Sequence, residues 1–67
     1  MTHNNNFVQQ LRKEKSITQE QLAEMVGVTR QTIIAIEKGN YSPSVFLALK
    51  ICAVLGKTVE EVFQNEE

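Results

Sequence analysis

The chain is divided at regular intervals by residues that stop and start helices. Gly27, Gly39 and Gly56 each follow a stretch whose apolar residues recur at helical spacing, the position where a left-handed helix end favours glycine. A hydroxyl side chain that can accept from free backbone N–H groups precedes most stretches. These hydroxyl residues are Thr18, Thr29, Ser42 and Thr58.

The same helix-starting and helix-ending residues indicate the fold class. Capping-box spacing occurs twice, at Thr18 with Gln21 and at Thr58 with Glu61. Pro43 follows Ser42 and suits a first helical position. Five short helices are expected, over about residues 5–14, 18–26, 29–37, 43–55 and 58–64. No segment alternates apolar and polar residues long enough to predict a strand, so an all-α fold is expected.

The length of 67 residues predicts a single domain, residues 1–67. With 42% hydrophobic and 22% charged residues, the composition is that of a soluble globular chain. Apolar side chains at helical spacing should supply its core. Those expected to face inward are Phe7, Val8, Leu11, Leu22, Ala23, Met25, Val26, Leu47, Leu49, Ile51, Val54 and Leu55, with Cys52 as a small buried hydrophobe.

Several classes of chemistry are excluded by the residue types that the chain lacks. It has no Asp, one His (His3) and one Cys (Cys52). A Ser-His-Asp triad, a Cys/His zinc site, an EF-hand and an internal disulfide all need more. We therefore expect no enzyme, no metal and no cofactor. The run 45–55, broken by Lys50, is too short for a bilayer, and without a signal peptide at the start a cytoplasmic location is expected.

The net charge of −1 hides an uneven distribution. Residues 1–50 carry six basic and four acidic side chains, a net +2, whereas residues 51–67 carry one basic and four acidic side chains, a net −3. The body is thus mildly basic and the end acidic. This distribution fits a basic face that meets phosphates, and it equally fits an ordinary mixed surface.

The third expected helix, residues 29–37, has two distinct faces at about 100° per residue. One side gathers Thr29, Thr32, Ile33, Ile36 and Glu37, and the other gathers Gln31, Ile34, Ala35 and Lys38, with Arg30 at its edge. Arg pairs with guanine, Gln pairs with adenine, and an aliphatic side chain contacts the thymine methyl. The outer side therefore fits base reading, although a solvated helix face with one stray Ile is the alternative.

The connection before this helix favours base reading. Gly27-Val28-Thr29 is a very short link, in which Gly ends one helix, Val28 fills the angle and Thr29 caps the next. Such a tight turn is typical of the helix-turn-helix geometry, which points its second helix outward into a major groove.

The stretch from Leu11 to Gly39 resembles the phage-repressor and Cro-type helix-turn-helix family, in particular its compact stand-alone bacterial regulators. The similarity extends through the fourth and fifth helices to nearly the whole chain. The positions that match the family, in order, are Thr18-Gln19, Leu22-Ala23, Gly27-Val28, the run Thr29-Arg30-Gln31-Thr32-Ile33, Ile36-Glu37 and Gly39. The resemblance implies a five-helix DNA-binding domain with its helix-turn-helix at about 18–37, followed by helices at about 43–64.

The resemblance also implies roles for matching positions. Arg30 and Gln31 would read bases, and Ile34 would lie deeper along the same face. Backbone phosphates would be contacted by Gln19, Thr29, Lys38, Asn40 and Tyr41. Arg12 and Glu37 match a family pair that forms a partly buried ion pair; two unrelated surface charges are the alternative.

The sequence departs from the family at Phe46 and Ala53, where polar or basic residues are frequent. The two lie seven residues apart and share one face of the fourth helix. An exposed Phe is either an isolated surface residue or part of a dimer interface. The interface would comprise Phe46, Ala53, Val59, Val62 and Phe63.

Two functions remain open at this point. The first is a sequence-specific regulator of transcription, most simply a repressor, that binds double-stranded DNA as a homodimer without a small-molecule effector. The second is a protein-interaction module of the same fold, such as one member of an inhibitor or antitoxin-like pair, because fold alone does not determine function.

Overall fold

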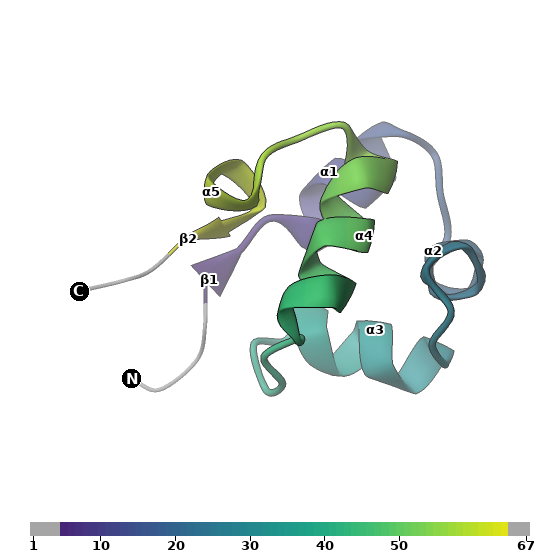
Figure 1. The fold of residues 1–67 in the computed structure, drawn as a ribbon. Coiled ribbons are helices and arrows are strands. Elements are labelled where there is room, and N and C mark those ends of the chain that lie inside the picture. Colours follow the sequence, from purple (N-terminus) through teal and green to yellow (C-terminus); the bar gives the residue numbers. More distant parts are fainter. Residues whose placement is uncertain (1–4, 65–67) are drawn as a thin grey trace.

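The computed structural model describes residues 5–64, and within this range it confirms an all-α fold of five helices (Figure 1). His3, Glu66 and Glu67 lie outside the described residues. The helices are α1 (Val8–Glu14), α2 (Gln19–Val26), α3 (Arg30–Glu37), α4 (Val45–Leu55) and α5 (Val59–Val62). Two short strands, β1 (Asn5–Asn6) and β2 (Phe63–Gln64), pair in antiparallel fashion at one side of the bundle.

The expected helix caps are present at most positions. Thr18 and Thr58 each form a complete capping box with the residue three positions later, and the Thr29 hydroxyl accepts from the backbone N–H of Thr32. In the second box, the Thr58 backbone N–H donates to the Glu61 carboxylate and lowers the pKa of that side chain. These local bonds satisfy N–H groups that a helix start leaves without partners.

Four helices end in a left-handed residue. After α2, α3 and α4 that residue is a glycine, as the sequence predicts. After α1 it is Ser16, with φ of 58°. The Ile17 N–H donates to the Arg12 carbonyl at 3.1 Å, which closes the same type of helix end without a glycine.

The outer helices are shorter than the sequence predicts. The expected helix 5–14 begins only at Val8, and the expected helix 58–64 ends at Val62. Asn5 pairs with Gln64 and Asn6 with Phe63, and the Phe7 N–H donates to the Val62 carbonyl at 2.8 Å. The two ends of the described chain bond to each other and not within their own helices.

The start of the fourth helix also differs from the expectation. Ser42 with Pro43 was expected to open it at about residue 43, but α4 begins at Val45. The hydroxyl of Ser44 accepts from the Leu47 N–H at 3.1 Å and caps the first turn. Hydroxyl residues flank Pro43 on both sides, so the local signal does not distinguish the two starts.

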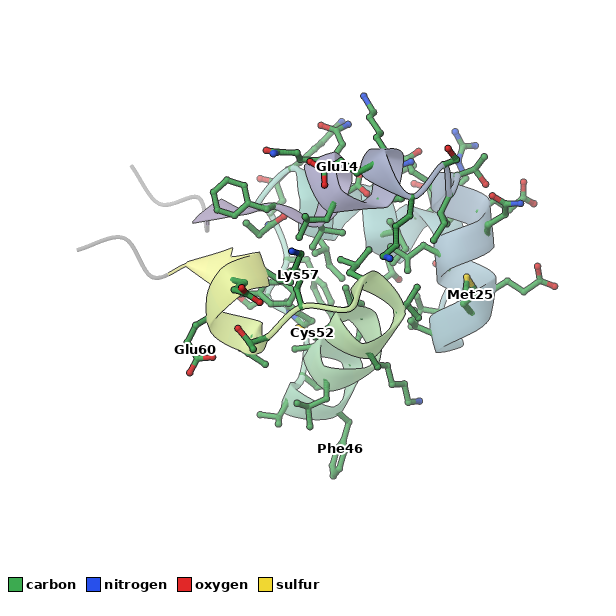
Figure 2. The ribbon with its side chains drawn as sticks, turned by 90° about the horizontal axis from the view of Figure 1, so that it is seen from above. Glu14, Met25, Phe46, Cys52, Lys57 and Glu60 are labelled. Carbon is green, nitrogen blue, oxygen red and sulfur yellow. The ribbon has the colours of Figure 1, made fainter. Side chains whose placement is uncertain are left out.

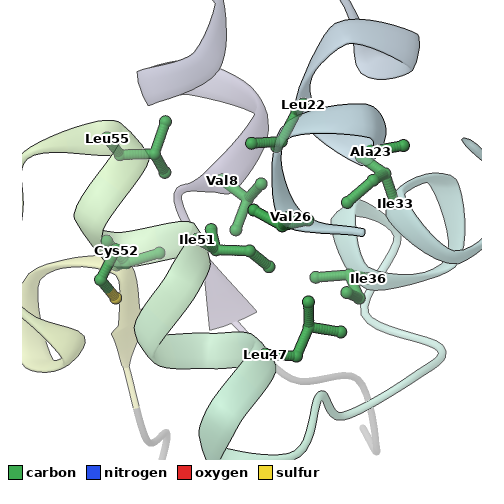
Figure 3. Close-up of a cluster of buried hydrophobic side chains, with 11 residues drawn as sticks. Val8, Leu22, Ala23, Val26, Ile33, Ile36, Leu47, Ile51, Cys52 and Leu55 are labelled. Carbon is green, nitrogen blue, oxygen red and sulfur yellow. The ribbon is translucent and has the colours of Figure 1, made fainter. Parts of the chain in front are cut away.

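All five helices contribute to the core, which lies mainly between α1, α2, α3 and α4 (Figure 3). It contains Val8, Leu22, Ala23, Val26, Ile33, Ile36, Leu47, Ile51, Cys52, Leu55 and Val62. Three expected core residues lie at the surface: Phe7 is 38% exposed, Met25 58% and Leu49 51%. Phe7 precedes the first turn of α1, while Met25 and Leu49 lie on the helix sides opposite the buried stripes of α2 and α4.

Cys52 is buried in this core, as expected. Burial raises the pKa of its thiol, and the nearby Glu60 carboxylate adds to the rise. The thiol therefore stays neutral and acts as a small apolar side chain.

The described part of the chain contains no cluster of three His, Cys, Asp or Glu side chains that could bind a metal ion. Among the helices of residues 5–64, none has both the length and the hydropathy needed to cross a bilayer.

A buried ion pair joins the first and third helices. Arg12 Nε lies 2.7 Å from Glu37 Oε2, and the two side chains are only 7% and 3% exposed. Arg12 also donates to the Ile17 carbonyl at 2.8 Å, and the Gln19 amide donates to Glu37 Oε1 at 3.1 Å. One network thus connects α1, the turn after it, the start of α2 and the end of α3.

We expect this network to fail cooperatively when one partner is removed. Replacing Arg12 by Met leaves the buried Glu37 carboxylate without its cation, at a cost of about 3–5 kcal/mol in the free energy of unfolding. Replacing both Arg12 and Glu37 by Met removes both charges and should cost less than the sum of the two single changes. Urea denaturation of the four proteins in a double-mutant cycle measures the coupling; strictly additive losses would show that the pair is not coupled.

Candidate nucleic-acid interface

Helices α2 and α3 form the expected helix-turn-helix. The connection is closed by Gly27 in the left-handed conformation, with φ of 79°, and the Val28 N–H donates to the Ala23 carbonyl at 3.0 Å. Val28 itself packs against the core, and Thr29 caps α3. In Figure 1, α2 is seen end-on while α3 runs across the bottom of the view, so the two helices cross steeply over the most extensive helix contact of the molecule.

Helix α3 has a buried and an exposed side. Ile33 and Ile36 are completely buried, and Glu37 is held in the network with Arg12. Arg30 and Gln31, in the first turn, are exposed. Ile34 and Ala35, expected on the outer side, are half-buried. The inner side of α3 is therefore fixed against the body of the protein, and its first turn faces solvent.

The two polar groups in the first turn of α3 have no partners within the described chain. The Arg30 guanidinium and the Gln31 amide take part in no ion pair or side-chain hydrogen bond among residues 6–63. An unengaged guanidinium and amide side by side offer five N–H donors and a donor-acceptor amide to an external ligand.

The segment after α3 presents further exposed polar groups. Lys38, Asn40 and Tyr41 are all exposed, and Tyr41 is 48% exposed. Gly39 between them is left-handed, and the Asn40 N–H donates back to the Ala35 carbonyl at 2.9 Å. The tight end of α3 thus brings a cation, an amide and a phenol to one short stretch of surface.

Gln19 and Thr29 stand at the starts of α2 and α3. Thr29 is exposed, and its hydroxyl lies 3.1 Å from that of Thr32. Gln19 is half-buried because its amide donates to Glu37. The resemblance implied only a phosphate contact for Gln19, and sequence reasoning missed its bond to Glu37.

Helix α4 carries the apolar surface expected around Phe46 and Ala53. Phe46 is 78% exposed and points away from the molecule in Figure 2, and Ala53 is exposed as well. Val45 and Leu49, which the sequence did not assign to this face, extend it. We call Val45, Phe46, Leu49 and Ala53 the α4 stripe.

Part of the expected dimer interface is unavailable. Val62 is completely buried in the core of its own chain, and Phe63 is half-buried against the same core. Val59 remains at the surface with 38% exposure. Directly after Val62 the chain forms β2, which pairs with β1, and the sequence pattern did not reveal this pairing.

Comparison with known proteins identifies the family. The helix-turn-helix family matches residues 8–62. An HTH-type transcriptional regulator of Methanothermobacter thermautotrophicus is 56% identical over 62 residues, which cover 91% of this chain and 90% of that protein. One from Bacillus subtilis is 55% identical over 62 residues, covering 92% and 94% of the two chains.

The fold agrees with a solved structure. The restriction-modification controller protein C.AhdI from Aeromonas hydrophila superposes with a TM-score of 0.74 and 30% identity, over 81% of this chain and 82% of that one. Family, relatives and fold thus converge on one class of protein. This chain belongs to the helix-turn-helix family and is a transcriptional regulator with that family's DNA-binding fold.

Proposed function

We propose that the protein is a repressor that binds operator DNA as a homodimer, with α3 of each protomer in a major groove. The observation that carries the proposal is the exposed, unengaged pair Arg30 and Gln31 at the start of α3. In helix-turn-helix docking, the first turns of the second helix meet the base edges. Arg pairs with guanine O6 and N7, and Gln pairs with adenine N6 and N7.

Phosphate contacts fix the helix in the groove. Lys38, Asn40 and Tyr41 lie directly after α3, and Thr29 lies at its start, so the two groups flank the base-reading turn. Gln19 contributes through the backbone N–H groups of the first turn of α2 and through the part of its amide that Glu37 does not engage. Ile34 meets a thymine methyl with its exposed portion.

Dimerisation compensates for the low charge of the domain. With a net charge of −1, a single domain makes few favourable interactions with the phosphate backbone. Two half-sites about one helical turn, or ~34 Å, apart double the specific contacts. The α4 stripe with Val59 is the surface that supports self-association, because it exposes adjacent apolar side chains on one helix side.

Two relatives are phage repressors, which support repression as the regulatory effect, whereas BcrR of Enterococcus faecalis is a transcriptional activator. The cryptic phage CTXphi transcriptional repressor RstR of Vibrio cholerae is 32% identical over 60 residues. A dimer bound across an operator occupies DNA that polymerase would otherwise contact, so blocking access of polymerase is the simplest mechanism of repression.

A protein partner is the second candidate function, and the α4 stripe is the observation that favours it, since apolar patches also bind other proteins. A module of that kind does not need Arg30, Gln31 and Lys38 at the surface. Gel shifts with genomic fragments at two salt concentrations separate the two functions, because only the DNA-binding protein retards fragments at low salt.

We expect base-reading and phosphate-contacting residues to behave differently. Arg30→Ala and Gln31→Ala should each weaken binding to the cognate site by about 1–3 kcal/mol and relax base preference there. Lys38→Ala should weaken binding to all DNA sequences alike and reduce the dependence of affinity on salt concentration. Fluorescence anisotropy with cognate and scrambled duplexes measures both effects.

Lys57→Ala is the matched control, because it removes a positive charge from the exposed turn before α5. Its base preference should equal that of the wild type. Undiminished cognate binding by both Arg30→Ala and Gln31→Ala would refute the assignment of the recognition surface.

We expect Phe46→Glu to convert the dimer to a monomer, because a carboxylate in the centre of an apolar interface must be desolvated. Sedimentation velocity across a concentration series measures the change. Met25→Glu is the control, since Met25 is an exposed apolar residue on α2 outside the α4 stripe. A Phe46→Glu protein that remains dimeric would move the interface elsewhere.

A further inference from the structure

The side chain of Asn6 bonds to two helices at once. Its Oδ1 accepts from the Val8 N–H at 3.1 Å, and its Nδ2 donates to the Ile36 carbonyl at 2.8 Å. The first bond satisfies a backbone donor at the start of α1, and the second reaches the last turn of α3, thirty positions along the chain. The half-buried carboxamide thus links the N-terminal strand to the recognition helix.

The carbonyl that Asn6 contacts lies in the turn that ends α3. The Gly39 N–H donates to the same Ile36 carbonyl at 3.0 Å, and a carbonyl oxygen has lone pairs for both donors. The chain leaves this turn as the segment Lys38–Tyr41, in which Lys38, Asn40 and Tyr41 are exposed. The direction in which that segment departs therefore depends on a group that Asn6 holds.

Asn6 is itself held in place by the other end of the described chain. It pairs with Phe63 in the β1–β2 ladder, and the neighbouring Phe7 N–H donates to the Val62 carbonyl. Val62 is completely buried. The end of α3 is consequently attached to the body from two sides, through Asn6 and through the Arg12–Glu37 pair.

We infer that Asn6 is a positioning residue for DNA binding: its bond to the Ile36 carbonyl orients the phosphate-contacting segment Lys38–Tyr41. The inference rests on the proposed function for the role of that segment. The Arg12–Glu37 pair holds α3 as a whole, whereas Asn6 acts at the point where the chain leaves the helix. Loss of the bond should therefore affect phosphate contacts more than base reading.

Two substitutions separate the roles of the carboxamide. Asn6→Asp and Asn6→Ser both keep an acceptor for the Val8 N–H, while neither the carboxylate nor the short hydroxyl replaces the donor to the Ile36 carbonyl. Gln9→Glu is the charge control, since this exposed residue of α1 gains the same charge and has no side-chain hydrogen bond to α3.

Amide hydrogen exchange followed by NMR tests the coupling without DNA. In both Asn6 variants the Gly39 and Asn40 amides should exchange about 2–10-fold faster, the range that one net hydrogen bond spans. The Ile33 amide, in the middle of α3, should exchange as in the wild type. Unchanged exchange at Gly39 and Asn40 would overturn the inference, as would equal acceleration along the whole chain.

DNA binding tests the positioning role. Across a salt series, the slope of log affinity against log salt should fall in magnitude by about 1 in both Asn6 variants, with base preference retained. Gln9→Glu should keep the base preference and the exchange rates of the wild type. The inference would be overturned if affinity fell in proportion to global stability while the slope stayed unchanged. Asn6 would then be a purely structural residue.

Failure of the proposed DNA-binding function can be distinguished from failure of the inference about Asn6. If the wild-type protein itself binds no duplex, the proposed function fails, and the exchange rates of Gly39 and Asn40 still decide whether Asn6 orients the segment. If the wild type binds and the Asn6 variants keep its slope, only the inference about Asn6 fails.

Discussion

The ion pair between Arg12 and Glu37 is the interaction on which the placement of α3 depends. Two opposite charges withdrawn from water destabilise a small domain unless each finds further partners. Here Arg12 also bonds the Ile17 carbonyl and Glu37 also accepts from Gln19, and every buried side-chain nitrogen and oxygen in the described chain has a hydrogen-bond partner. Such a network contributes orientation more than net stability, because the pair is favourable only in one arrangement of the helices.

Because its inner side is fixed by packing and by the ion pair, α3 can expose hydrogen-bonding side chains on its outer side. Ile33, Ile36 and Glu37 take up the inner side of α3, so Arg30 and Gln31 remain exposed without partners in the described chain. The free energy of folding is supplied by the apolar residues that all five helices contribute to the core and not by the outward groups. The outward side chains are thus open to change without loss of the fold.

Features encoded by neighbouring residues could be predicted from the sequence, and features made by distant residues could not. The capping boxes at Thr18 and Thr58 and the glycine ends depend on a few adjacent residues, and they are present as predicted. The β1–β2 ladder and the bond from Asn6 to Ile36 join segments far apart in the chain. An Asn before an apolar stretch is by itself typical only of a helix cap, so the sequence carries no signal for the bond from Asn6 to α3.

Which helix residues are exposed could be predicted only in part, because exposure also depends on contacts between residues far apart in the chain. Helical spacing correctly placed Phe46 outside the core, but it assigned Met25 and Leu49 to the interior. Which side of an apolar helix is covered depends on the neighbours that pack against it, and α4 is apolar on nearly all sides. The bond from the Phe7 N–H to the carbonyl of the buried Val62 likewise forms only when the two ends of the described chain meet.

The most direct test of the central claim, that α3 enters a major groove with Arg30 and Gln31 against base edges, is methylation interference on a duplex selected from a random pool. Methylation of guanine N7 lies in the major groove and that of adenine N3 in the minor groove. The account predicts that N7 methylation at one or more guanines in each of two half-sites, about one helical turn apart, abolishes binding. Interference confined to adenine N3, or selection that enriches no sequence, would contradict it.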